Sequence, residues 1–97
     1  MIYHITNKQQ WAEAQAAGAF EEPSLHTEGF IHNCTAEQVN GVLDRYYKGQ
    51  TDLLLLHIDE AKLKAELKYE LAPSVNEMFP HIFGVVNLDA VVKITDI

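Results

Sequence analysis

The sequence predicts a compact α+β fold, a single domain over residues 1–97 with a bent or split sheet and two main helices. Segments with strand and helix patterns follow one another in the order β, α, short element, β, α, β, short α, β, β. The strands are short, and two long helices are too few to cover both faces of a large parallel sheet. A chain of 97 residues can bury one modest core.

The first third of the chain predicts two strands and two helical segments. "IYHIT" at residues 2–6 is rich in β-forming residues and predicts the first strand. "TNKQ", which begins at Thr6, is a capping-box pattern that predicts a helix over roughly Asn7–Ala17, ended by Gly18. "PSLHTEG" predicts one short helical turn capped by Ser24, and "GFIHN" predicts a short strand.

A second capping box opens the second helix, and a buried strand follows it. "TAEQ" at Thr35 repeats the capping pattern, and the helix after it ends at Gly49. Its apolar residues recur at helical spacing, at Val39, Val42, Leu43 and Tyr46. "TDLLLLHID" is a continuous apolar run of strand length, which predicts a strand in the middle of a sheet with both faces covered.

The last third predicts a short turn and two further strands. Asp59 is the expected cap of a short helical turn, "EAKLKA". "ELKYEL" alternates, which predicts a half-buried strand with Leu67, Tyr69 and Leu71 on its buried face. "APSVNEM" predicts a loop, "FPH" a proline-fixed turn, and the final strand is expected around Val91 to Thr95.

The composition excludes several classes of protein. With a net charge of -7 and only seven lysines and arginines, the chain offers no basic face for general nucleic-acid binding. Four consecutive leucines form the longest apolar run, whereas a membrane span needs about 20 residues. The single cysteine excludes an intrachain disulfide and fits a reducing compartment. Together with an N-terminus that lacks a signal-peptide pattern, these features predict a soluble cytoplasmic protein without a membrane partner.

Five histidines are many for this length, and three of them lie inside apolar runs: His4, His32 and His81. A buried imidazole needs partners for both ring nitrogens. Each ring taken alone is best interpreted as a hydrogen-bonded core residue. Taken together, the three predict a shared site, whereas His26 and His57 are treated as background.

Three other interpretations concern residues near these histidines. His32 and Cys34 share a face of a strand, which a metal could use, but structural metal sites repeat such a pair, so no metal is expected. Cys34 lies beside a helix start and is either a nucleophile with a histidine base or a small buried apolar residue. Glu70 is either a solvated strand carboxylate or a general base presented to a cleft.

In combination the motifs are more specific. "YHIT", a tryptophan in the first helix, "SLHTEGFIH", "TAEQV", "YYKGQTDLLLLHID", "KYE" and "FPHIFG" follow in this order. The set resembles domain-of-unknown-function family 952 (DUF952) over nearly the whole chain. The fold of that family looks like that of the ADP-ribosyltransferases, as a compact and divergent branch. The resemblance implies a split, mostly antiparallel β core with helices outside, and between the sheet halves a cleft that holds NAD in that superfamily.

The resemblance also implies roles for individual residues. His4 looks like the residue that holds the adenosine-side ribose, and the strand of His32 like a wall of the nicotinamide pocket. Either Glu70 or His81 would act on the nicotinamide ribose. The residues expected to be catalytic are His32, Glu70 and His81, and those expected to bind the cofactor are His4, Thr6, Ser24, Gly29, Phe30 and Cys34. Cys34 stands where the family tends to carry a hydroxyl.

The expected function is binding of NAD, as a substrate, or of an ADP-ribose-like nucleotide in a cleft lined by histidines. ADP-ribosyl or phosphoribosyl transfer is the activity that the resemblance implies. This sequence has no clear copy of the usual glutamate-bearing loop motif, so two alternatives stay open. One is a binding module for a nucleotide or small molecule without catalysis, and the other is a thiol- or metal-dependent hydrolase that uses Cys34.

Overall fold

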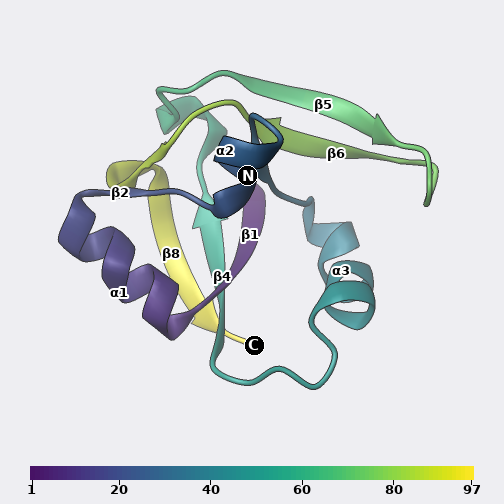
Figure 1. The fold of residues 1–97 in the computed structure, drawn as a ribbon, viewed down its shortest axis with the longest axis horizontal. Helices are drawn as coiled ribbons and strands as arrows, with labels where there is room; N and C mark the ends of the chain where they lie inside the picture. The colour runs from purple at the N-terminus through teal and green to yellow at the C-terminus, as the bar shows by residue number, and fades with distance from the viewer.

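The computed structural model describes residues 1–97 (Figure 1). Its eight strands are β1 (Ile2–Asn7), β2 (Ala19–Phe20), β3 (Ile31–His32), β4 (Leu53–Ile58), β5 (Leu67–Ala72), β6 (Glu77–Ile82), β7 (Val86–Asn87) and β8 (Val91–Asp96). The α-helices are α1 (Lys8–Ala17), α2 (Pro23–Thr27) and α3 (Val39–Tyr46), and the 3₁₀ helices are η1 (Ala36–Gln38), η2 (Glu60–Lys62) and η3 (Leu88–Ala90). None of these helices has the length and apolarity needed to cross a membrane.

The strands form three separate sheets, and every pairing is antiparallel. The orders are β1-β4-β8, β2-β7 and β3-β6-β5. β4, the leucine-rich run, is the middle strand of its sheet, which confirms that prediction. The prediction of an α+β fold with a split sheet is also confirmed. The sequence patterns do not predict β2 and β7, because a strand of two residues is too short to show alternation. They do not predict β6 either, since it begins in the segment expected to be a loop and contains the expected proline turn.

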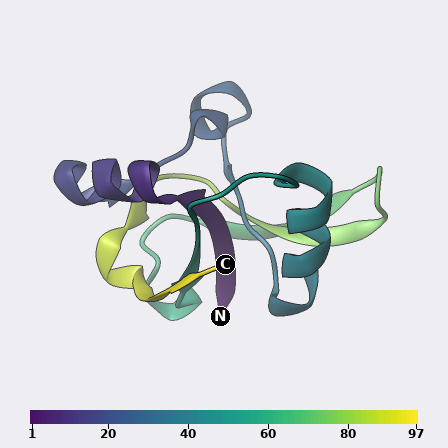
Figure 2. The ribbon, with the colours of Figure 1, turned by 90° about the horizontal axis from the view of Figure 1, so that it is seen from below.

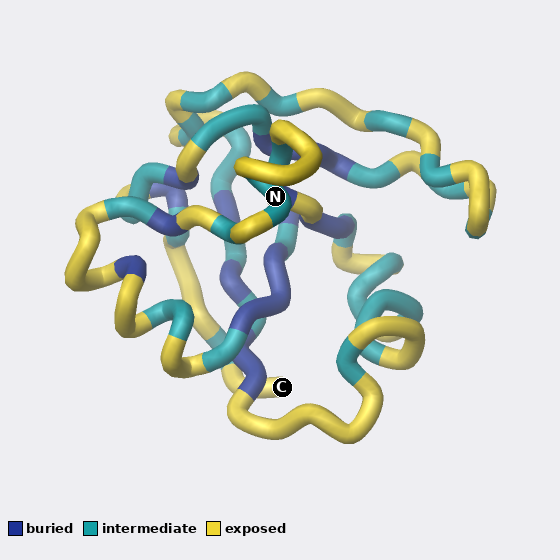
Figure 3. Tube along the Cα trace, in the orientation of Figure 1, coloured by how far each residue is buried: buried dark blue, intermediate teal, exposed yellow.

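One core joins the three sheets to α1. Its nine buried members come from all three sheets, from α1 and from η3: Ile2, Ala14, Phe20, Ile31, Leu56, Ile58, Ile82, Val86 and Ala90. The tube in Figure 3 is dark along much of β1 and β4, each of which has four buried residues. Helices α1 and α3 lie on opposite sides of the molecule in both ribbon views (Figures 1 and 2).

The β5–β6 hairpin extends away from this core, and its far end is exposed (Figure 3). The predicted buried face of β5 is confirmed only at Leu67, which packs against the core. Further along the strand the prediction is wrong, since Tyr69 is 45% exposed and Leu71 is 54% exposed. Tyr69 is nevertheless held, since its hydroxyl donates to Glu60 Oε1 at 2.6 Å. Burial and this hydrogen bond raise the pKa of Tyr69 to about 12.

The start of α1 differs from the predicted capping box. The cap is Asn7, whose side-chain oxygen accepts the backbone N–H of Gln10 at 2.7 Å. Thr6 lies one residue before this cap, is 2% exposed, and its hydroxyl donates to Gln10 Oε1 at 2.8 Å and not to the helix backbone. Gly18 ends α1 as predicted, in the left-handed conformation with φ of 88° that favours glycine.

Of the three other predicted helix caps, the structure contradicts one and confirms two. Ser24 lies inside α2 and does not cap it. The N-cap is Glu22, whose side chain makes no capping hydrogen bond, and Pro23 begins the helix. Thr35 forms the predicted capping box, but it opens η1, which then continues into α3. Asp59 caps η2 as predicted, since its carboxylate accepts the backbone N–H of Ala61 at 3.0 Å.

The structure also corrects the predicted end of the second helix and the predicted proline turn. α3 ends at Tyr46, before Gly49. Pro80 lies within β6, not in a turn. It accepts the backbone N–H of Asn33 at 3.1 Å but has no N–H to donate in return, so the pairing of β3 with β6 stops at His32. This short pairing sets His32 directly opposite His81.

We expect Asn7→Ala to lower the free energy of unfolding by about 1 kcal/mol, because the N–H of Gln10 loses its acceptor. Gln9→Ala is the matched control, since Gln9 would complete the Thr6 capping box that the structure lacks; it should change stability by less than about 0.5 kcal/mol. Urea denaturation of both variants checks this. A larger loss in Gln9→Ala than in Asn7→Ala would contradict the assigned cap.

Candidate functional site

A cleft of about 480 Å³ lies between the β1-β4-β8 sheet and the β3-β6-β5 sheet. Its walls come from β1, the start of α2, residues 32–34, α3 and the β5–β6 hairpin. Most of the lining side chains are apolar or aromatic. His4, His32 and His81 all line it, although they are far apart in the sequence. The structure thus brings together the three histidines for which the sequence predicted a shared site.

Backbone hydrogen bonds hold two of these walls together. The amide of Tyr3 donates to the carbonyl of Cys34, and the amide of Cys34 donates to the carbonyl of Tyr3, both at 2.8 Å. This isolated antiparallel bridge connects β1 to the chain that leaves β3. Because Tyr3 and Cys34 both line the cleft, the bridge fixes the distance between these two walls.

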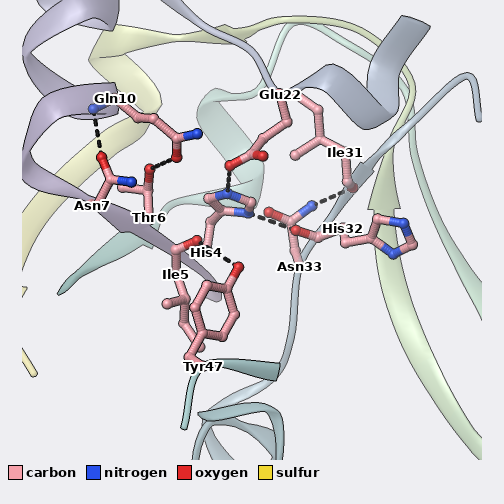
Figure 4. Close-up of polar contacts among 10 residues, drawn as sticks. All are labelled: His4, Ile5, Thr6, Asn7, Gln10, Glu22, Ile31, His32, Asn33 and Tyr47. Atoms are coloured by element: carbon pink, nitrogen blue, oxygen red, sulfur yellow. Dashed lines mark hydrogen bonds and ion pairs between the residues drawn. The ribbon is translucent and has the colours of Figure 1, made fainter. Parts of the chain in front are cut away.

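His4 strengthens the same junction through its ring (Figure 4). Nδ1 lies 2.6 Å from the carbonyl oxygen of His32, and Nε2 lies 2.8 Å from Glu22 Oε1. A carbonyl only accepts, so Nδ1 carries a hydrogen. The second hydrogen bond then uses one proton, which lies between Nε2 and the carboxyl oxygen. The side chain of His4 is 6% exposed and that of Glu22 is 19% exposed.

This arrangement changes the role expected for His4. Neither ring nitrogen is free to hold a ribose, because both are bonded within the chain. Glu22, which the sequence analysis missed, lines the cleft with a second carboxylate oxygen that has no partner in the chain. A carboxylate oxygen is a good acceptor for a ligand hydroxyl. Only its position before Pro23 marked Glu22 in the sequence, and that signals a helix start.

His81 lies opposite His32 and is held by a carboxylate from the neighbouring strand. Its Nδ1 lies 2.8 Å from Glu70 Oε1, and its ring stacks on Phe30 with centroids 4.0 Å apart and planes 8° apart. His81 is 9% exposed and lines the cleft. Its Nε2 has no hydrogen-bond partner in the chain.

His32 is less buried than its apolar neighbours predicted. Its side chain is 55% exposed, and Nε2 lies 3.0 Å from Glu28 Oε2, which is itself 50% exposed. Successive side chains of a strand point to opposite faces, so Ile31 is buried in the core whereas His32 is exposed and lines the cleft. The rings of His32 and His81 have their centroids 5.3 Å apart.

Cys34 is a buried thiol and not an activated one. It is 2% exposed, and burial raises its pKa to about 11, so the thiol is protonated at neutral pH. The expectation that a helix start would favour the thiolate is wrong here, because desolvation dominates. Nowhere do three or more His, Cys, Asp or Glu side chains form a group suited to a metal ion.

Among the other predicted site residues, only Ser24 lines the cleft. Thr6 lies deeper along β1 and bonds to Gln10. Gly29 has a φ of 90° in the turn before β3. Phe30 and Glu70 do not line the cleft, but both contact His81, which does.

Two further lining residues escaped the sequence analysis. Asn33 is 5% exposed, and its Oδ1 is the one buried side-chain polar atom without a partner, while its Nδ2 donates to the carbonyl of Ile31 at 2.9 Å (Figure 4). An orphaned buried acceptor in a native fold calls for an explanation. Tyr47 donates from its hydroxyl to the carbonyl of Ile5 at 3.4 Å, and burial, followed by the negative charge of Glu22, raises its pKa.

His4→Ala should destabilise the fold by about 1–3 kcal/mol, because it leaves the carbonyl of His32 and the Glu22 carboxylate without their donor. Glu22→Gln is the conservative control: the Gln side-chain N–H donates to the unprotonated Nε2 of the neutral ring, so the loss should be smaller. Thermal or urea unfolding compares the two. An unchanged stability in His4→Ala would show that the junction does not depend on the ring.

Cys34 should react slowly with iodoacetamide in the folded protein at pH 8. The shift from a pKa of 9.0 to about 11 lowers the thiolate fraction about a hundredfold, and burial slows access further. Because folding raises the pKa of Cys34, the contribution of the protonated thiol to the free energy of unfolding is complete below pH 9.0. It is lost as the pH rises toward about 11. Mass spectrometry follows the labelling, with urea-unfolded protein as the reference. Equal rates in the two states would refute a buried, protonated thiol.

Two solved structures are similar to this chain over nearly its full length. The crystal structure of protein CC0527 from Caulobacter crescentus is 30% identical, has a TM-score of 0.88, and the match covers 98% of this chain and 83% of that one. The solution NMR structure of CC0527 is 30% identical with a TM-score of 0.83, over 98% and 82% of the two chains. No curated protein matches the chain.

A family match covers almost the same span. The family described as protein of unknown function DUF952 matches residues 5–94, which include β3, the β5–β6 hairpin and most of the cleft lining. The chain therefore belongs to the DUF952 family.

Proposed function

We propose that the cleft binds an ADP-ribose-like nucleotide, with NAD as the candidate substrate, and that the chain is a compact relative of the ADP-ribosyltransferases. The observation that carries the proposal is the convergence of His4, His32 and His81, all within motifs of the resemblance, on one cleft between two sheets. Its volume of about 480 Å³ falls in the range of small-molecule sites. The proposal includes a cytoplasmic location, where a single unpaired cysteine stays reduced.

The walls of the cleft suit the planar parts of such a ligand. Tyr3, Tyr46, Tyr47 and Phe79 line it, and aromatic rings stack on nucleobases and on a nicotinamide ring. The unpartnered carboxylate oxygen of Glu22, Oε2, favours a ligand that brings hydroxyl or amide donors. A ribose supplies the first kind of donor and a carboxamide the second.

The charges of the cleft restrict how a pyrophosphate is held. None of the lining residues is a lysine or an arginine. The phosphates would therefore meet imidazoles and hydroxyls of the lining, among them the exposed His32 and Ser74 and the half-buried Ser24. This arrangement favours a ligand whose phosphates stay partly in solvent while its rings enter the apolar part of the cleft.

Titration with NAD or ADP-ribose should raise the thermal stability of the protein in a saturable way, by about 2.7 kcal/mol at one hundred times the dissociation constant. Ser74→Trp should abolish the effect, because Ser74 is exposed and lines the cleft, so a bulky ring there obstructs it without disturbing the core.

The matched control is Thr51→Trp, an equally exposed position in the loop before β4 and outside the cleft. It should bind like the unmodified protein. The proposal fails if neither NAD nor ADP-ribose stabilises the chain, or if Ser74→Trp binds as well as Thr51→Trp. Saturable binding without release of nicotinamide would instead identify a binding module without catalysis.

A further inference from the structure

Glu70 and His81 form a hydrogen-bonded pair at the edge of the cleft that sets the tautomer of the imidazole. The two side chains come from paired strands, β5 and β6, and Nδ1 of His81 lies 2.8 Å from Glu70 Oε1. A carboxylate accepts, so the ring hydrogen lies on Nδ1. In the neutral ring, Nε2 then carries a lone pair, and no group of the chain bonds to it.

The ring is also held in place by its neighbours. Phe30 stacks on it at 4.0 Å, and His32 approaches with its edge at 5.3 Å. The His81 side chain is only 11% exposed, and His81 lines the cleft while Glu70 does not. The imidazole is therefore the member of the pair that a bound ligand can reach.

Neither of the other two cleft histidines has this arrangement. Both nitrogens of His4 are bonded within the chain. The two glutamates are similarly exposed, Glu28 at 50% and Glu70 at 44%, but the ring of His32 is 55% exposed, so its contact with Glu28 gives it little fixed orientation. Among the three, His81 alone combines a buried ring, a carboxylate that orients it and a free nitrogen.

We propose that His81 is the general base of the cleft and that Glu70 is its positioning residue, which does not itself contact the substrate. The inference rests on the proposed function, because it places the base beside a bound NAD. Nε2 takes a proton from water as the water oxygen forms a bond to the anomeric carbon of the nicotinamide ribose. The glycosidic C–N bond breaks, its electron pair stays on the nicotinamide nitrogen, and the products are ADP-ribose, neutral nicotinamide and the proton on His81.

The first experiment needs no ligand. NMR of protein labelled with ¹⁵N in histidine should show a hydrogen on Nδ1 and an unprotonated Nε2 for neutral His81. Glu70→Gln should keep this tautomer, because the side-chain carbonyl of Gln still accepts from Nδ1, whereas Glu70→Ala should give a mixture of tautomers. Glu66→Ala, an exposed carboxylate just before β5, is the control and should leave the signal unchanged. A hydrogen on Nε2 in the unmodified protein overturns the proposal.

The second experiment measures nicotinamide release from NAD by chromatography. His81→Gln should lower the rate by about a hundredfold or more, the usual contribution of a general base, with NAD affinity changed less than about twofold. Glu70→Ala should be slower than Glu70→Gln, following the loss of the tautomer, and Glu66→Ala should match the unmodified protein.

The outcomes separate this inference from the proposed function. If NAD binds but His81→Gln releases nicotinamide at the unmodified rate, or if no nicotinamide is released at all, the general-base role is overturned while the binding cleft stands. If NAD does not bind, the proposed function falls, and with it the reaction assigned to His81. The tautomer measured by NMR then shows separately whether Glu70 orients the ring.

Discussion

The junction between β1 and residues 32–34 is the contact on which the cleft depends. Two backbone hydrogen bonds join Tyr3 to Cys34, and the ring of His4 adds bonds to the carbonyl of His32 and to Glu22. Three segments that are distant in sequence therefore meet at one buried imidazole. Hydrogen bonds between buried groups are directional and expensive to break, so the junction holds the two sheets at a defined separation. The cleft is the space that this separation leaves.

Each cleft histidine is paired with a glutamate, and the degree of burial separates their roles. The His4–Glu22 pair is the most buried and belongs to the junction. In the Glu70–His81 pair the ring is 11% exposed and lines the cleft, the carboxylate is 44% exposed, and one nitrogen of the ring is unused. The contact between Glu28 and His32 is exposed and contributes little to stability. A histidine paired with a glutamate is thus structural at His4 and suited to proton transfer at His81. Burial separates the roles, because a charged partner affects a buried ring more strongly than an exposed one.

Local patterns predicted several elements, and packing decided the rest. The leucine run of β4, the Thr35 capping box and the Gly18 stop were predicted because each depends on neighbouring residues alone. The cap of α1 moved from Thr6 to Asn7 because β1 continues one residue further than its pattern showed. Pro80 was assigned to a turn, but a partner strand that ends at the same place accommodates its missing N–H.

The sequence by itself determined the α+β class, the main elements and the three histidines that line the cleft, because periodicity and residue type are local properties. Only the tertiary structure showed that His4 has no free nitrogen, that Cys34 is a protonated thiol, and that Glu22 and Asn33 belong to the site. It also showed that Glu70 contacts His81 and lies outside the cleft lining. Hydrogen-bond partners and desolvation depend on segments brought together by folding, and no spacing along the chain encodes them.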